Sequence, residues 1–492
     1  MDHPSNPHPC RHSHPLATLD NHLKSLARSL LQTHHHNLST LLRSPLSEIS
    51  GSLGDLGTLL PILIALTLNN SISLPSTLVF SGLANIYTGV LFGIPLPVQP
   101  MKAIAAVALA QKFSKEEIAS AGIFVAGAIG VLSLTGLVRW FTNRIPIPGV
   151  KGIQLGTGLS LILSAGNLYP SSIPGSSVSL LNAAVLLLCF LALLASSAFR
   201  RIPYALIILL LGIIFVGFAD LYSDGPGAEG HSIPHLKLWH PQAFVPSWYS
   251  FQKGVLEAGI GQLPLTTLNS VIAVAFLAQD LLPEVEAPST TTLGLSVMGI
   301  NLVGCWFGAM PVCHGSGGLA AQYRFGARSG ASIIFLGLVK LVLGLFASEI
   351  ALHIFINFPS VLLCILVIAA GLELIKVGES LNTAGVRNLN PLDRASSVER
   401  AMHNEDEDKI VSGLTERDRK RRWAVMFMTV AGILAFRNDA IGFSGGMLCH
   451  WSFQWQDNME ERRSRHGGYK ILGPESQEED DIAQGRPSEG TC

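Results

Sequence analysis

The chain has 492 residues, of which 48% are hydrophobic and only 14% charged, and its mean hydropathy is +0.41. Soluble domains carry about 25% charged residues, so this composition excludes an ordinary soluble protein and favours one whose apolar surface faces lipid. The net charge of -1 says nothing about partners, because the charges lie in the tails and loops and not in the hydrophobic segments, and we expect no nucleic-acid partner.

The N-terminal stretch 1–46 is polar and rich in His, Pro and Ser, with histidines at positions 8, 12, 14 and 34–36. Because these histidines lack cysteine or carboxylate partners at ligand spacing, they favour a disordered polar tail over the alternative of a metal site. Seven cysteines lie far apart and indicate no disulfide framework. No cleavable signal peptide is visible, so we expect membrane entry to begin at the first apolar helix.

Apolar runs that predict membrane helices fill most of the remaining chain. In the first half they lie at 55–69, 75–92, 99–112, 116–141, 148–166, 179–198 and 203–221. In the second half they lie at 254–279, 289–308, 314–326, 329–348, 359–376, 423–436 and 439–451. The runs at 99–112 and 314–326 are too short to cross a bilayer alone, which is typical of the discontinuous helices of transporters.

Three short matches recur between the halves in the same order. Gly54–Pro61 resembles Ala258–Pro264, Phe92-Gly93 before Pro97 resembles Phe307-Gly308 before Pro311, and Gly158–Ile162 resembles Gly371–Ile375. An odd number of helices in each half would make the second half enter from the opposite side. We therefore predict an all-α membrane protein of about 14 transmembrane helices in a 7+7 inverted repeat. A chance match of Gly-, Pro- and Leu-rich strings is the alternative.

This organisation divides the chain into a tail (1–46), a first repeat (47–221), an extracytosolic loop (222–253), a second repeat (254–452, with a cytosolic loop at 377–422) and a disordered C-terminal tail (453–492). The loop cations support this topology because most of them fall on one side, which the positive-inside rule assigns to the cytosol. They are Arg139, Arg144, Lys151, Arg200, Arg201, Arg324, Arg328 and the basic run ending at Arg422. Both termini are then cytosolic.

The segments that begin at Pro97 and Pro311 are the predicted binding site. Each interrupts an apolar run and then opens a helix, so two helix N-termini could face one small anion at mid-membrane depth. A buried dianion needs donors in place of water, and glycines let it approach the backbone closely. The predicted substrate-binding residues are Gln99, Met101, Lys102, His314, Gly315, Ser316, Gly317 and Gly318. Tight helix packing is the alternative role of the glycines.

Charged residues in or beside the apolar runs are candidates for coupling. Lys102 either pairs with the substrate or an intramembrane carboxylate, or extends to the membrane surface. Asp55 and Glu257 begin the first helices of the two halves, where they could carry protons or cap a helix N-terminus. Polar residues expected to line the path are Thr58, Asn85 and Gln262.

The sequence from Ser47 to about Ile375 resembles the molybdate transporter family of fungi, plants and algae, a branch related to the sulfate permeases. The strings that carry the resemblance are Gly54–Thr58, Pro97–Lys102, Phe307–Ala320 and Gln322–Arg328. It implies a seven-plus-seven inverted repeat with a core domain that moves against a gate domain. Sulfate permeases usually end in a cytosolic regulatory domain, whereas here the last predicted helix is followed by a short tail, which favours molybdate.

Three functional hypotheses follow. The first is a proton-coupled secondary transporter of a tetrahedral oxyanion, above all molybdate. The second is a sulfate or bicarbonate transporter, or an anion channel, of the same fold. The third, a membrane enzyme or sensor, is weak because Ser316 lacks the G-x-S-x-G context and no acid completes a triad with His314. We expect no catalytic residue, cofactor or metal. The expected partners are molybdate or sulfate, protons, the lipid bilayer of the plasma or vacuolar membrane, and a second copy in a homodimer.

Overall fold

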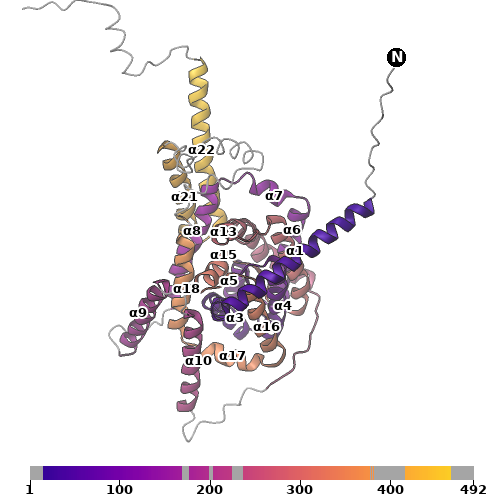
Figure 1. The fold of residues 1–492 in the computed structure, drawn as a ribbon, viewed down its shortest axis with the longest axis vertical. Helices are drawn as coiled ribbons and strands as arrows, with labels where there is room; N and C mark the ends of the chain where they lie inside the picture. The colour runs from indigo at the N-terminus through magenta and orange to yellow at the C-terminus, as the bar shows by residue number, and fades with distance from the viewer. Residues whose placement is uncertain are drawn as a thin grey trace, which may run out of the picture.

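The computed structural model describes residues 15–168, 177–198, 203–223, 236–376, 378, 381 and 416–466 (Figure 1). Up to the middle of the chain it contains α1 (Pro15–Arg43), α2 (Pro45–Ser52), α3 (Leu56–Leu68), α4 (Leu74–Phe92), β1 (Val98–Pro100), α5 (Lys102–Gln111), α6 (Lys115–Leu134), α7 (Leu137–Thr142), α8 (Ile147–Leu168), α9 (Ser177–Ala198) and α10 (Tyr204–Ser223).

The second half begins with a helix that changes its winding: α11 (Trp248–Gly254), the π-helical turn η1 (Val255–Gly259), α12 (Ile260–Leu265), the π-helical segment η2 (Thr266–Ala273) and α13 (Val274–Leu281). It continues with α14 (Thr290–Gly304), the 3₁₀ turn η3 (Cys305–Phe307), β2 (Val312–His314), α15 (Ser316–Arg324), α16 (Ala331–Phe346), α17 (Ser348–Asn357), α18 (Ser360–Lys376), α21 (Glu416–Phe436) and α22 (Asp439–His466).

Helices lie at every position that the apolar runs predict, so the mostly helical fold is confirmed. The predicted helix at 116–141 is two helices, because Gly136 adopts φ 75° and ends the first. By length and apolar composition, four of the described helices could cross a membrane, or five if α16 and α17, which meet at 112°, form one span. The count of about 14 membrane helices therefore stays a prediction.

Much of the expected N-terminal tail is ordered, which differs from the prediction. Residues 15–43 form α1, and its Asn37 is buried between α4 and α16. The Asn37 side chain donates to the Gly89 carbonyl and accepts from the Gly330 N–H, both at 2.9 Å. This amide satisfies one backbone group on each helix, so it docks α1 on the bundle. At the other end, α22 continues to His466 through the first part of the expected C-terminal tail.

The helices form two groups that lie side by side (Figure 1). The strand group contains α3–α6, α11–α16 and both strands; within it α4 packs on α16, and α6 packs on α14 and α11. The long-helix group contains α8, α18, α21 and α22; within it α8 packs on α18, α21 and α22. Contacts of α15 with α18 and of η2 with α8 and α22 join the groups. The strand pair thus lies in the group that meets the long helices through α15.

Glycines set the close packing of α4 on α16. A β-carbon built on Gly82 would lie 2.8 Å from the Gly337 carbonyl oxygen, and one built on Gly337 would lie 2.6 Å from the Gly82 carbonyl oxygen. Gly89 and Gly330 contact each other in the same reciprocal way about two helical turns along. Small residues let two backbones approach this closely, so the packing role that glycines often have in membranes applies to this pair of helices.

Candidate functional site

The two predicted breaks meet in space as an antiparallel strand pair. Gln99 lies opposite Cys313, and Val98 lies opposite His314. Left-handed glycines, Gly93 at φ 66° and Gly308 at φ 70°, end the preceding helical segments and turn the chain into each strand. Because the strands are antiparallel, α5 starts beyond Pro100 at one end of the pair and α15 starts beyond His314 at the other end, so the two helix N-termini lie on either side of the strand pair.

Two asparagines hold the strands in equivalent ways. The Val98 N–H donates to Asn85 Oδ1 of α4 at 2.8 Å, and the Val312 N–H donates to Asn301 Oδ1 of α14 at 2.7 Å. Asn85 is fully buried behind β1. The sequence predicts a path-lining role for this residue, whereas its carbonyl is used to fix the strand. Asn301 has the same task in the second half, although no role is predicted for it from the sequence.

The N-terminus of α15 carries unused backbone donors. No described group accepts from the N–H of Ser316, Gly317 or Gly318, and no side chain caps this helix. Free N–H groups at a helix start, together with the positive end of the helix dipole, form a binding site for an anion. These three consecutive residues are predicted substrate-binding residues, and the structure leaves their amides available.

Gln99 covers this helix start. A β-carbon at Gly318 would lie 2.5 Å from Gln99 Nε2, and one at Gly315 would overlap Gln99 Oε1. Gln99 Nε2 also donates to Asp55 Oδ1, and both side chains are buried. Glycine is therefore needed at 315 and 318 to admit the glutamine. The predicted residues Gln99, Asp55, Gly315 and Gly318 come together at one place.

The N-terminus of α5 is occupied to a larger extent, which corrects the expectation of two open helix starts. Gln262 Oε1 of α12 accepts from the Ala103 N–H at 2.8 Å and from the Ile104 N–H at 3.4 Å. The Gln262 Nε2 donates to Thr266 Oγ1 at 2.9 Å. Gln262 is thus a cap of α5, and the anion-binding capacity of the backbone lies mainly at α15.

Lys102 brings a positive charge to this neighbourhood. It is half-buried in the first turn of α5 and makes no hydrogen bond or ion pair with the described residues. Its charge interacts electrostatically with Cys313 of β2 and with Asp439 at the start of α22. Lys102 therefore lies beside the strand pair, on the side of the strand group that α22 approaches.

Three predicted binding side chains are used within the protein. Met101 is completely buried in an apolar cluster with Leu59 and Leu63, and this is a packing position. His314 is also fully buried, with Nε2 3.1 Å from Ser296 Oγ. Ser316 Oγ donates to Asn269 Oδ1 at 2.5 Å. These side chains differ from the expectation of direct contact with a ligand, although the Ser316 amide stays open.

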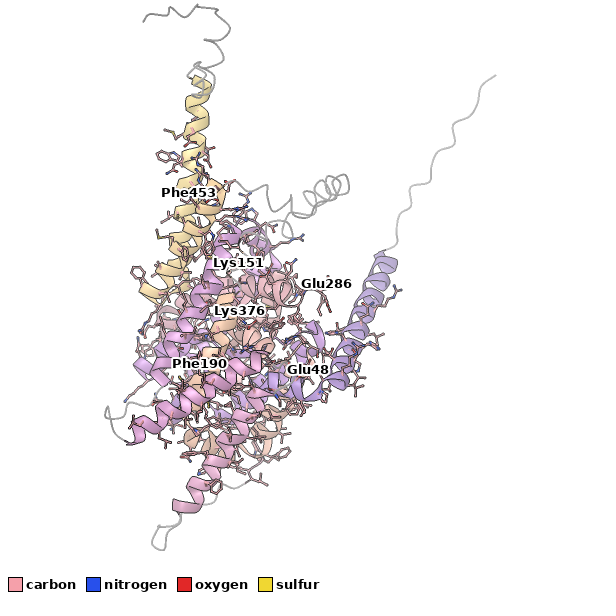
Figure 2. All side chains as sticks on the ribbon, turned by 60° about the vertical axis from the view of Figure 1, so that its left-hand side comes forward. Glu48, Lys151, Phe190, Glu286, Lys376 and Phe453 are labelled. Carbon is pink, nitrogen blue, oxygen red and sulfur yellow. The ribbon has the colours of Figure 1, made fainter. Side chains whose placement is uncertain are left out.

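The remaining predicted residues are not part of this cluster. Glu257 lies on the exposed side of η1, where Lys253 is close enough to interact electrostatically. Thr58 belongs to α3, but its side chain lies outside the described residues. Lys151, which the topology prediction places in a loop, is buried in α8 and forms an ion pair with Asp280 of α13 at 2.5 Å (Figure 2).

Further polar residues at the site were missed. Asn269 and Ser270 of η2 contact the second break: Asn269 accepts from Ser316, and Ser270 Oγ donates to Cys313 Sγ at 3.1 Å. Their signal is the polar run Thr266–Ser270 inside an apolar helix. Lys340 is a lone charge inside the apolar helix α16, which contradicts the placement of all charges in tails and loops.

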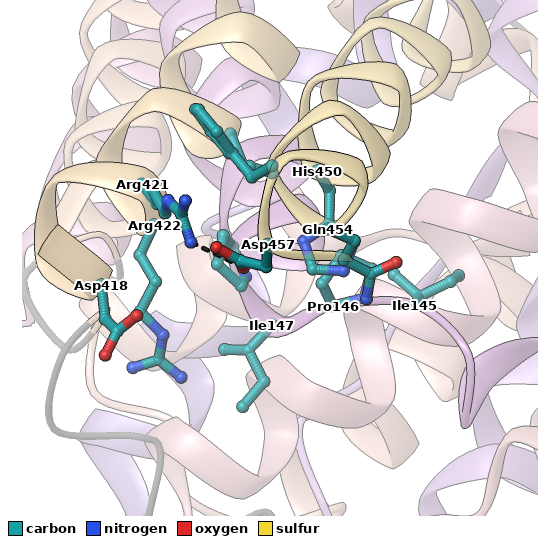
Figure 3. Close-up of a pocket in the computed structure, with 12 residues that line it drawn as sticks. Ile145, Pro146, Ile147, Asp418, Arg421, Arg422, His450, Gln454 and Asp457 are labelled. Atoms are coloured by element: carbon teal, nitrogen blue, oxygen red, sulfur yellow. Dashed lines mark hydrogen bonds and ion pairs between the residues drawn. The ribbon is translucent and has the colours of Figure 1, made fainter. Parts of the chain in front are cut away.

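A cavity of about 450 Å³ lies between the start of α8, the first half of α21 and the middle of α22 (Figure 3). Arg421 and Arg422 line it, together with Asp418, His450 and Asp457. Arg421 Nη1 donates to Asp457 Oδ2 at 2.8 Å, and Arg422 Nη1 donates to the Leu381 carbonyl at 3.1 Å. Internal acceptors engage Nη1 of each arginine, whereas the buried Arg421 Nη2 has no partner among the described residues.

The profile of a family described as "Molybdate transporter of MFS superfamily" matches residues 47–161 and 254–374. Molybdate transporter 2 of Arabidopsis thaliana is 40% identical over 389 residues, which cover 70% of this chain and 81% of that protein. The chain belongs to the molybdate transporter family. Molybdate transporter 1 of the same plant is 39% identical over 395 residues, covering 71% of this chain and 84% of that protein. The resemblance inferred from the sequence strings is confirmed.

The fold is similar to that of a solved anion transporter. Murine Solute Carrier 26 family member A9 in the inward-facing state superposes with a TM-score of 0.51 over 93% of this chain and 77% of that chain, at 12% identity. At this identity the likeness concerns the fold alone. The matched segments 47–161 and 254–374 contain both strands, α5 and α15, so the family and this site coincide in the chain.

Proposed function

We propose that this chain is a secondary active transporter that carries a tetrahedral oxyanion, molybdate first among them, across a membrane by alternating access. The observation that carries the proposal is the start of α15, where three backbone N–H groups are unused, Gln99 lies over the helix end and Lys102 lies beside the strand pair. Backbone donors can replace the water of a dianion without a cluster of fixed cations that would hold it too tightly. The relatives named molybdate transporters support molybdate as the ion.

The alternating-access part rests on an inverted 7+7 repeat, with the strand group as the core and the long-helix group as the gate. Two features of the strand pair are reciprocal between the halves. Val98 and Val312 are the first residues of the two strands, and Pro100 and His314 are the last. Each first residue lies opposite the last residue of the other strand, so the register is the same from either half. Asn85 and Asn301 hold equivalent strand amides. A construction of this kind supports rocking of one group against the other around a site at their interface.

Proton coupling is proposed because inward movement of a dianion is unfavourable. Against an inside-negative potential it costs roughly 4–5 kcal/mol per 100 mV, so accumulation requires a cotransported cation. Asp55 is favoured as the proton carrier because it is buried and bonded to Gln99, whereas Glu257 lies on an exposed face of η1. Asp55→Asn should abolish the response of uptake to an imposed pH gradient. Glu257→Gln, for which the sequence alone favours the larger effect, should have the smaller effect because Glu257 is exposed.

The deciding experiment is uptake of labelled molybdate by cells that lack their own molybdate transporter and express this chain. We expect concentrative uptake that a large excess of sulfate does not displace. Equal competition by sulfate would assign the chain to a broader oxyanion carrier, and uptake that only equilibrates the ion would indicate a channel.

A further inference from the structure

A lysine is buried inside α16, a helix of the strand group. Lys340 of α16 is only 4% exposed, and its Nζ has no hydrogen-bond partner among the described residues. Its side chain starts at the contact with α4, where a β-carbon on Gly82 would lie 3.3 Å from Lys340 Cβ. An amine placed this way in an apolar bundle is costly unless an opposite charge compensates it.

That opposite charge is Asp55, with which Lys340 interacts electrostatically. The α3 and α4 helices contain no Asp, Glu, Lys, Arg or His. The other elements packed on α16 carry described charged or titratable groups, none of which interacts with Lys340 in this way: Glu48 in α2, Glu349 and His353 in α17, and Arg28, His34, His35, His36 and Arg43 in α1. Asp55 is also the group that accepts from Gln99 at the start of α15.

We propose that Lys340 is a charge-compensating residue of the anion site, which acts through Asp55 and Gln99 and links proton uptake to oxyanion binding. This proposal rests on the proposed oxyanion transport. When Asp55 is ionised, the Asp55–Lys340 couple is neutral and contributes little to binding a dianion. When Asp55 takes up a proton, the ammonium of Lys340 is left uncompensated, and its field stabilises the bound anion.

The linkage follows from this arrangement without a further group. A dianion and a proton arrive together, because each makes the other more favourable. The two protonation states of Asp55 also explain how the anion can be released. When Asp55 loses its proton, the Asp55–Lys340 couple becomes neutral again and the excess positive charge is removed. In this proposal Lys340 acts on the anion through its charge and does not contact the substrate.

The test is molybdate binding by the purified full-length protein in detergent, measured by calorimetry between pH 5.5 and pH 8, together with a thermal unfolding curve for each variant. We expect Lys340→Met to weaken molybdate binding on the order of tenfold, because the variant loses one positive charge that acts on a dianion without contacting it. Asp55→Asn should bind at least as tightly as the wild type and lose the pH dependence. The double variant should bind more tightly than Lys340→Met, because no uncompensated carboxylate remains.

Lys237→Met, in an exposed segment, is the matched control and should bind as the wild type does. Wild-type affinity and pH dependence in Lys340→Met, or a double variant that binds no more tightly than Lys340→Met, would overturn the role of Lys340. If Lys340→Met does not fold, Asp55→Asn decides: a retained pH dependence of binding rejects the linkage. A wild-type protein that binds no oxyanion would reject the proposed function instead, so the two failures are distinct.

Discussion

Gly158 of α8 and Gly371 of α18 lie directly against each other. A β-carbon on Gly158 would lie 2.9 Å from the Gly371 carbonyl oxygen, and one on Gly371 would lie 2.7 Å from the Gly158 carbonyl oxygen. These two glycines start the strings Gly158–Ile162 and Gly371–Ile375 that recur between the halves. The repeated string therefore contacts its own copy, which is the arrangement expected where a pseudo-twofold axis passes between two helices.

Replacing Gly158 should loosen this helix pair. Gly158→Val places a branched side chain against backbone that cannot move away, and we expect a loss of about 1–3 kcal/mol of stability. Thermal unfolding in detergent measures it. Gly166→Val on the same helix is the control, since a β-carbon there meets nothing within 4 Å. Equal unfolding temperatures of the two variants would show that the close contact is unimportant.

The glycine at position 318 tests the anion site without disturbing the helix pair. In Gly318→Ala the new methyl group would overlap the amide of Gln99 and displace it from the start of α15. We expect molybdate affinity to fall on the order of tenfold, the equivalent of about 1.4 kcal/mol, while the protein remains folded. Calorimetric titration gives the affinity. Gly299→Ala in α14, where the added atom meets nothing, should bind as the wild type does; an unchanged affinity in Gly318→Ala would remove Gln99 and this helix start from the site.

The parts of the site that depend on the interruptions of the apolar runs at Pro97 and Pro311 could be predicted from the sequence. A proline followed by a helix start is visible in the string itself, so α5 and α15 were located, as were Gln99 and the glycines of α15, whereas the short strands β1 and β2 were not predicted. The sequence does not show which of the two helix starts, α5 or α15, keeps free backbone N–H groups. Gln262 caps α5 from a position 159 residues away, and no local pattern indicates which amide reaches which backbone.

The sequence also does not show which individual side chains near the breaks are buried. Met101, before α5, and His314, in β2, lie at the breaks, yet both side chains are fully buried in the protein. Segments this short show no periodic pattern that reveals which side faces the core. Lys340 and Asn301 are single polar residues in apolar helices. Intramembrane polar residues of this kind mark functional positions, and that rule would have identified Lys340.

The ion pair between Lys151 and Asp280 joins the long-helix group to the strand group. Lys151 is 2% exposed and Asp280 is 24% exposed, and Gln154 Nε2 adds a bond to the Ala273 carbonyl at 2.9 Å on the same face. Asp280→Asn should loosen this contact and speed amide hydrogen exchange in α8 and α13, because a buried ammonium loses its counter-ion. Lys376→Met breaks an ion pair within α18 and is the control. Unchanged exchange in Asp280→Asn would show that this pair does not hold the groups together.

Glu48 should make stability depend on pH. Burial raises the pKa of the Glu48 carboxyl from 4.5 to about 7, although its Oε1 accepts from the Arg328 N–H at 3.0 Å. It lies in α2, before the first apolar helix (Figure 2). Because the folded protein binds this proton more tightly than the unfolded chain, its contribution is present below pH 4.5 and is lost as pH rises through about 7.

Glu48→Gln cannot titrate, so the unfolding temperature of the wild type should fall relative to this variant between pH 4.5 and about 7 and then stay level. Glu349→Gln, at an exposed position in α17, is the control and should follow the wild type. A constant difference between wild type and Glu48→Gln across this range would show that Glu48 is ionised throughout.

The location of the anion tests the account most directly. Crystals grown with molybdate allow the metal to be found by anomalous diffraction at the molybdenum absorption edge. The account predicts a peak at the start of α15, with its oxygens about 3 Å from the amides of Ser316, Gly317 and Gly318 and with Gln99 beside it. A peak in the cavity between α21 and α22 or at the capped start of α5, with none at α15, would contradict it.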